Sequence, residues 1–227
     1  MNRSLFSLGL IFLVALSSAA LATPTTQIWN PSTDIQANGV WHFGIDNYFT
    51  AVGAAEGGYA FPTDLGLTYG LLPGLEIGAD LFEPQSSPLT FNLKYGINEQ
   101  EKLPALAVGG FGFGTQNNVT DQNVLYAVAA KTFPLGRLSA GYFIGNERIL
   151  ADLSGVKDNS GIILTWDKQF TDKLWVCVDY AGSRSVLGAT FYGFAWAFAA
   201  NTSVLFGYGT YNNGAKPTLT TQLDINL

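Results

Sequence analysis

The chain has 227 residues, and its charged fraction of 12% is about half of the roughly 25% that soluble domains carry, while 48% of its residues are hydrophobic. This composition argues against a globular protein whose whole surface faces water. The formal net charge of −6 excludes the basic footprint that phosphate binding needs, so we expect no nucleic-acid partner.

The first predicted element is an export signal. Arg3 precedes an apolar core from Leu5 to Leu16, and the small-residue triplet Ala20-Leu21-Ala22 follows. The apolar core is too short to span a bilayer comfortably, so this order predicts a signal peptide over residues 1–22 that is cleaved near Ala22. Without Arg3, ten basic residues remain against 17 acidic ones, which is a net charge of −7.

Residues 23–38 follow, and they contain Trp29-Asn30-Pro31 but no regular alternation of apolar and polar side chains. The sequence leaves three roles open for this segment: an ordered plug, a periplasmic segment that lies along the fold, or a flexible leader. We therefore separate residues 23–38 from the repeating region that begins at residue 39.

From residue 39 onward, apolar and polar residues alternate with a period of two, which indicates β-strands. No stretch in this region reaches the roughly 18 apolar residues that a membrane-spanning helix requires. Only helices and closed barrels satisfy the backbone hydrogen bonds in hydrocarbon. We therefore predict an all-β fold, a single antiparallel up-and-down transmembrane β-barrel over residues 39–227. About twelve strands are expected, over residues 39–50, 58–70, 75–82, 89–97, 104–114, 123–133, 137–145, 160–170, 174–181, 187–198, 203–212 and 218–227.

The alternation is clean in some strands and diluted in others. In residues 89–97, for example, Leu93 and Tyr95 lie opposite Asn92 and Lys94. Glycine and alanine dilute the pattern in three stretches, where two registers one residue apart stay open: 104–114, 123–133 and 187–198. In the last of these we assign four aromatic side chains to the outer face: Tyr192, Phe194, Trp196 and Phe198.

The predicted connections alternate in length. Short turns are expected at residues 72–74, 98–102, 134–136, 171–173 and 199–202, with longer links between them, the longest at 146–159. Outer-membrane barrels have short periplasmic turns and longer external loops, and an even strand count places both termini in the periplasm. A soluble β-sandwich is the alternative fold, but it would cover its outside with charge, which this chain lacks.

The last strand carries a recognisable ending. Leu223, Ile225 and Leu227 alternate with polar residues, and this ending resembles the C-terminal assembly signal of the outer-membrane β-barrel proteins of Gram-negative bacteria, although those chains usually close on Phe or Trp. The hairpin at residues 69–78, echoed at 95–98, resembles hairpins of porin-like putative transporters, including the family linked to phenol meta-pathway degradation. The resemblance covers the mature chain. It implies a place in the bacterial outer membrane, with membrane lipid and the barrel-assembly machinery as partners.

The inner face of the predicted barrel gathers ionisable side chains. Strand parity predicts these pore-lining residues: His42, Asp46, Asp64, Glu76, Asp80, Asn92, Lys94, Lys131, Arg137, Asp167, Asp179, Gln222 and Asp224. Seven of them are acids and three are bases, so pairing between them leaves a surplus of negative charge. Inward glycines such as Gly66, Gly78, Gly141 and Gly207 favour open space over a packed plug.

The predicted size of the barrel limits its function. Twelve strands about 4.8 Å apart and tilted about 40° close a cylinder roughly 24 Å across. Side chains then leave a narrow passage for small solutes or ions, and surplus acid predicts a preference for cations. A closed barrel with a structural, adhesive or assembly role is the alternative function. The sequence does not set the oligomeric state.

Other chemistry is weakly indicated. The only histidine, His42, has no His-x-Ser motif beside it, so we predict no enzyme, and lipid hydrolysis by a Ser-His pair stays a lesser alternative. The only cysteine, Cys177, has no second Cys and no nearby His, so we expect no metal and no cofactor. We expect aromatic side chains at the membrane interface, namely Trp41, Tyr59, Tyr69, Trp166 and Trp196.

Overall fold

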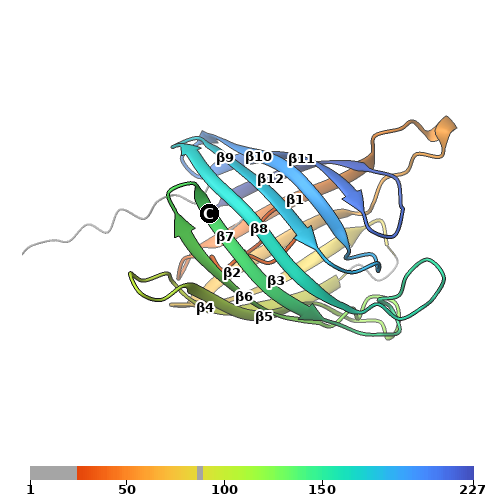
Figure 1. The fold of residues 1–227 in the computed structure, drawn as a ribbon, viewed down its shortest axis with the longest axis horizontal. Coiled ribbons are helices and arrows are strands. Elements are labelled where there is room, and N and C mark those ends of the chain that lie inside the picture. Colours follow the sequence, from red (N-terminus) through yellow and green to blue (C-terminus); the bar gives the residue numbers. More distant parts are fainter. Residues whose placement is uncertain (1–24, 86–88) are drawn as a thin grey trace, which may run out of the picture.

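The protein forms a closed barrel of antiparallel strands in a computed structural model that describes residues 25–85 and 89–227 (Figure 1). Each strand pairs with its neighbours in the sequence, and β1 pairs with β12 to close the sheet. The predicted all-β barrel is confirmed. The described residues form twelve strands: β1 (Trp41–Thr50), β2 (Thr63–Leu72), β3 (Leu75–Glu83), β4 (Leu89–Ile97), β5 (Ala105–Gly114), β6 (Val124–Phe133), β7 (Gly136–Ile144), β8 (Ser160–Thr171), β9 (Leu174–Ala181), β10 (Ala189–Ala199), β11 (Thr202–Tyr211) and β12 (Thr218–Asn226).

The two faces of the barrel differ in polarity. On β4, Phe91 and Tyr95 are 47% and 52% exposed on the outside, whereas Thr90 and Lys94 are 4% and 1% exposed on the inside. Successive side chains of a strand point to opposite faces, so the period of two in the sequence produces this division. An apolar outer face is the arrangement that a lipid-facing barrel requires.

The connections are short at one end of the barrel and longer at the other, as the sequence predicts (Figure 1). Two-residue turns follow β2, β6, β8 and β10, and a longer link, residues 98–104, follows β4, at the end where the C-terminus lies, which we call the turn end. Longer links follow the odd-numbered strands at the opposite loop end, including residues 145–159 between β7 and β8. The link after β1 contains a 3-10 helix, η1 (Ala54–Glu56). Among the described residues, no helix has the length and apolar character to cross a membrane.

Residues 25–38, which we call the luminal segment, lie inside the barrel and contact its inward side chains. The predicted signal peptide, residues 1–22, and the next two residues lie outside the described residues. The luminal segment comes very close to inward glycines of the barrel. A Cβ atom added at Gly70 would lie 2.0 Å from the Ala37 carbonyl oxygen, and one at Gly193 would lie 2.9 Å from Ile28 Cδ1.

One inward glycine changes an interpretation made from the sequence. A Cβ atom at Gly207 would lie 3.5 Å from Ile28 Cγ2 and 2.9 Å from Thr220 Cγ2. The view that inward glycines favour open space over a packed plug is wrong at this position, because Gly207 faces Ile28 of the luminal segment at packing distance rather than open space.

Glycine and alanine weaken the alternation in β6 and β10, and the inward and outward faces were predicted correctly in β10 but not at Lys131 of β6. The outward residues assigned in β10 are all exposed: Tyr192, Phe194, Trp196 and Phe198. In β6 the buried residues have even numbers, namely Val124, Tyr126, Val128 and Ala130. Lys131 therefore belongs to the outer parity, and its Nζ lies 2.9 Å from Glu99 Oε1 in the turn after β4. The prediction that Lys131 lines the lumen is wrong, because Ala127 and Ala129 on the outer face are small and leave no contrast with the inner face.

Candidate functional site

Apart from Lys131, the predicted pore-lining residues lie on the inner side of the barrel. One group surrounds the luminal segment and another faces a cavity beside it. The inward set is His42, Asp46, Asp64, Glu76, Asp80, Asn92, Lys94, Arg137, Asp167, Asp179, Gln222 and Asp224.

Asp179 on β9 binds the tip of the luminal segment. Its Oδ2 accepts hydrogen bonds from the backbone N–H groups of Ile28, Trp29 and Asn30, at 3.2, 2.8 and 2.9 Å. Its Oδ1 accepts hydrogen bonds from the Asn30 amide and, at 3.0 Å, from the Thr165 hydroxyl. Asp179 is 0% exposed, so these contacts replace the water that its carboxylate would otherwise bind.

Charged side chains hold the segment at other points. The Arg137 guanidinium donates to both carboxylate oxygens of Asp34, at 2.6 and 2.8 Å, and its Nε donates to Asp167 Oδ1 at 2.9 Å. Glu76 Oε2 accepts a hydrogen bond from the Gln36 backbone N–H at 2.6 Å. The planar guanidinium fits two carboxylates at once, which favours a fixed position for the segment.

Lys94 on β4 joins the segment to the barrel wall next to Glu76, its partner across β3 and β4. Its Nζ lies 3.2 Å from Glu76 Oε1 and donates to the Thr25 carbonyl oxygen at 3.0 Å. Both Lys94 and Glu76 are almost completely buried. A buried base and a buried acid are stable only when their charges are paired and their hydrogen bonds are formed. The Lys94 ammonium group meets this need through Glu76 and the luminal segment.

Aromatic rings cover the rest of the segment tip. The Trp29 ring stacks on Phe191 of β10 with centroids 5.1 Å apart and meets Tyr48 of β1 edge to face at 5.3 Å. The Trp29 indole N–H donates to the Leu187 carbonyl oxygen at 2.8 Å. Phe61 packs inward against Tyr48 with centroids 6.2 Å apart. Phe61 lies in the link before β2, which begins at Thr63 rather than at the predicted residue 58.

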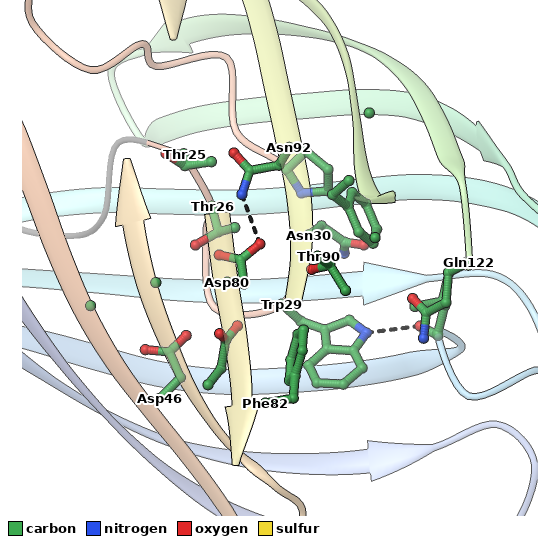
Figure 2. A pocket seen from close by; sticks show the side chains of 18 of the residues that line it. Thr25, Thr26, Trp29, Asn30, Asp46, Asp80, Phe82, Thr90, Asn92 and Gln122 are labelled. Atoms are coloured by element: carbon green, nitrogen blue, oxygen red, sulfur yellow. Dashed lines mark hydrogen bonds between the residues drawn. The ribbon is translucent and has the colours of Figure 1, made fainter. Parts of the chain in front are cut away.

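Beside the segment the lumen holds a cavity of about 510 Å³, which is lined by the inner faces of β1 to β8. Asp46 of β1, Asp64 of β2 and Asp80 of β3 face this cavity, and Asp46 and Asp64 are directly paired across the two strands. Figure 2 shows Asp46, Asp80 and Asn92 on one wall and the Trp29 ring beside them. The Asn92 amide donates to Asp80 Oδ2 at 2.7 Å. We call these three aspartates the acidic wall.

The acidic wall carries no matching base. In the described part of the chain, the luminal bases Lys94 and Arg137 form ion pairs with other acids, and none of the three aspartates forms an ion pair. Charge of one sign in a confined, low-dielectric space attracts counter-ions. Within residues 25–85 and 89–227, no group of three or more His, Cys, Asp or Glu side chains is placed to hold a metal ion.

Both ring nitrogens of His42 have partners at the turn end of the lumen. Nε2 lies 3.3 Å from Asp224 Oδ1, and Nδ1 lies 3.2 Å from Asn226 Oδ1. A histidine that takes a proton from a serine needs one ring nitrogen in contact with that hydroxyl. The geometry therefore gives His42 a packing role in the lumen rather than the arrangement of a Ser-His pair.

The predicted interface aromatics lie on the outside or at the rim. Trp41 is 44% exposed, and its ring lies 4.4 Å from that of Tyr69 across β1 and β2 at the turn end. Trp166 donates its indole N–H to the Leu135 carbonyl oxygen at 3.2 Å. Trp196 is 51% exposed on β10, and Tyr59, 42% exposed, lies in the β1–β2 link.

The C-terminal strand closes the barrel. Leu223 and Ile225 lie on the partly exposed face of β12, and β12 pairs with β1 along its whole length. The backbone N–H of Leu227 donates to the Trp41 carbonyl oxygen at 2.8 Å, so the last residue is joined to the first strand.

Sequence reasoning missed the residues of the luminal segment that fill the lumen. Gln27, Ile28, Asn30 and Gln36 are all less than 5% exposed, although they precede the strands and follow no alternation. The one signal in the sequence was the surplus of inward acids, because buried carboxylates without bases need other donors. The backbone N–H groups of the segment supply them to Asp179 and Glu76.

Comparison with known proteins shows the fold. No family model and no curated protein matches the sequence. Among solved structures, the KdgM porin in complex with disordered oligogalacturonate has a TM-score of 0.59 and 9% identity, over 81% of this chain and 98% of that one. The KdgM porin in a second structure has a TM-score of 0.55 and 9% identity, with the same coverage. This chain is thus similar to those porins in the architecture of its barrel.

Proposed function

We propose that this protein is an outer-membrane channel that passes small solutes or ions along the acidic side of its lumen. The observation that carries the proposal is a closed barrel that is apolar outside and encloses a cavity of about 510 Å³ whose lining includes the three aspartates of the acidic wall. The similarity to the KdgM porin structures supports the membrane location. The cavity extends from Thr68 and Glu76 near the turn end to Val119 and Val186 in loop-end links.

The acidic wall sets the proposed solute class. The carboxylates of Asp46, Asp64 and Asp80 would concentrate cations and repel anions in a narrow passage. One KdgM porin structure is a complex with oligogalacturonate, a polymer whose sugar units carry carboxylates. Such a ligand does not suit a cavity with an unmatched acidic wall. We therefore propose small cations and small neutral solutes for this chain.

Planar-bilayer recording of the purified, folded protein tests the proposal. Discrete conductance steps are expected. In a KCl gradient, the reversal potential should be shifted toward the equilibrium potential of K⁺. Absence of steps under conditions where a known porin conducts would overturn the channel function. Steps without cation preference would overturn only the role of the acidic wall.

Neutralisation of the acidic wall sharpens this test. The triple variant Asp46→Asn, Asp64→Asn, Asp80→Asn should keep the conductance steps and lose most of the cation preference. The matched control removes three exposed charges from the turns and links, with Glu56→Gln, Glu101→Gln and Asp172→Asn, and should keep the preference of the wild type. Equal reversal potentials for the two triple variants would contradict selectivity by the wall.

A second function has a specific observation in its favour. The luminal segment occupies part of the lumen and contacts both halves of the barrel, so a barrel in which it never moves would serve a structural or assembly role. The same recordings separate the two functions. A folded protein that conducts neither as wild type nor after the contacts of the segment are weakened would favour the structural role.

A further inference from the structure

The luminal segment is attached to the barrel in a different way from the strands. Each strand shares a ladder of backbone hydrogen bonds with both of its neighbours. Among the described residues, the segment forms a β-bridge to the barrel only where Asn38 meets Gly70, and its other hydrogen bonds to the barrel involve a side chain on one side or the other. Release of the segment would therefore leave the closed ladder of twelve strands intact.

The attachment depends strongly on one side chain. Three successive backbone N–H groups, those of residues 28–30, converge on a single carboxylate oxygen of Asp179. Successive N–H groups that point to one place form an anion-binding concavity, and here a buried carboxylate fills it. Hydrogen bonds to a charged acceptor are stronger than neutral ones, and a buried donor left without a partner is costly. The seated position is thus set mainly at Asp179.

Ile28 and Trp29 also pack against apolar and aromatic side chains, whereas the other contacts of the segment are polar and reversible in water. Arg137 binds Asp34, and Glu76 binds the Gln36 N–H, so most partners would regain hydration if the segment moved into open solvent. The segment enters β1 through Gly39, whose φ of 79° lies in the left-handed region that glycine adopts without strain. Gly39 lies at the turn end, where the segment leaves the lumen wall.

We propose that the luminal segment is a reversible gate, latched by Asp179, that narrows the lumen when seated and widens it on release. The inference rests on the proposed channel function, since a gate controls flow only in a barrel that conducts. The seated segment contacts inward side chains of β3, β4, β7, β8, β9 and β12, and the cavity beside the acidic wall is the space that it leaves open. Its release would uncover Asp179 and Asp167, and so would add further acids to the passage.

Cys177 offers a native probe of the seated state. Its Sγ lies 3.9 Å from Gln27 Oε1 beneath the segment, two residues from Asp179, and the side chain is 0% exposed. A small water-soluble thiol reagent reaches this sulfur from the lumen only after the segment moves. The rate of labelling in the folded, full-length protein therefore measures how often the gate opens, whether or not the barrel conducts.

The first experiment compares labelling rates in the wild type, in Asp179→Asn and in a matched control, Asp172→Asn, which changes the same residue type in an exposed turn. We expect labelling to be at least about tenfold faster in Asp179→Asn, because the amide loses the charge that binds three N–H groups. The control should match the wild type. Equal rates in all three folded proteins would overturn the gate. If Asp179→Asn does not fold, Gln36→Pro, which removes the N–H that donates to Glu76, takes its place.

The second experiment locks the gate. Gln27→Cys places a second thiol on the segment that covers Cys177, and a short bifunctional thiol reagent with an internal disulfide should link the two sulfurs and hold the segment in its seated position. Conductance in a planar bilayer should fall severalfold on cross-linking and recover on reduction of the linker. The same substitution with Cys177→Ser should give no redox response. Absence of a cross-link in folded protein would contradict the seated position itself.

The outcomes separate the gate from the channel. Conductance that is the same in the locked and reduced protein would overturn the gate and leave the channel standing. No conductance in the wild type or in Asp179→Asn would overturn the channel and the control of flow, while faster labelling of Cys177 would still establish that the segment moves.

Discussion

Asp179 on β9 and Asp64 on β2 both face the lumen, but they meet different surroundings. Asp179 accepts hydrogen bonds from three backbone N–H groups of the luminal segment, whereas Asp64 lies opposite Asp46 at the edge of a cavity of about 510 Å³. The same residue type therefore anchors the chain at one place in the lumen and faces an open cavity at another. The role of an inward acid depends on what the fold places opposite it.

Removal of the two kinds of acid should have very different effects on stability. Asp179→Ala leaves several buried donors without an acceptor and should lower the free energy of unfolding by about 3 kcal/mol. Asp46→Ala removes an acid that faces other acids and should change it by less than about 1 kcal/mol. Urea titration in detergent measures both. Equal losses would contradict the division of the lumen into an anchoring side and an open side.

Glycine substitutions probe the same division through packing. A Cβ atom at Gly70 would lie 2.0 Å from the Ala37 carbonyl oxygen, while one at Gly44 would have its nearest neighbour, His42 Nε2, at 3.7 Å. Gly70→Ala should therefore displace the segment and cost about 2 kcal/mol, as overpacking does. Gly44→Ala adds a methyl group to the open side and should be tolerated. Thermal unfolding of the two variants gives the comparison, and similar midpoints would contradict close packing at Gly70.

Arg137→Lys tests the charged contact of the segment. Lysine cannot reproduce the two parallel hydrogen bonds to Asp34 together with the bond to Asp167, so a loss of about 1 kcal/mol is expected. Arg148→Lys, in the exposed β7–β8 link, serves as the control and should have no measurable effect. A double-mutant cycle with Asp34→Asn isolates the pair. A coupling energy near zero would show that this contact does not hold the segment.

The smallest expected effect concerns the turn end, outside the membrane-spanning strands. The hydrogen bond from Lys131, together with those from Thr132, lowers the pKa of Glu99 to about 2. A carboxyl group with a lowered pKa stabilises the fold at pH values above its ordinary pKa. This stabilisation is lost as the pH falls toward 2. Lys131→Met should raise the pKa of Glu99 toward 4.5 and leave it somewhat low because Thr132 still donates. NMR titration of the Glu99 side chain measures this shift, and an unchanged value would contradict the ion pair between Lys131 and Glu99.

The barrel was predictable because its strands obey a simple physical rule. On β4 and β12, apolar outward residues alternate with polar inward ones, and the absence of any long apolar run left a closed barrel as the fold. The rule failed on β6, where Ala127 and Ala129 face outward. Alanine fits either face, so the pattern could not place Lys131.

The acidic wall was predictable and the anchored side was not. Strand parity alone placed Asp46, Asp64 and Asp80 inside the barrel. The partners of Asp179 are backbone N–H groups that lie about 150 residues earlier in the chain, and no side-chain pattern marks them. The luminal segment fills the lumen because its shape fits the inner wall of the barrel. The alternation of side chains along the strands carries no information about that fit.

Single-channel recording of the wild-type protein in a planar bilayer with a KCl gradient tests the central claim most directly. We predict discrete steps whose reversal potential lies on the cation side, because the acidic wall is the open side of the lumen. A folded protein that gives no steps where a known porin conducts would contradict the account.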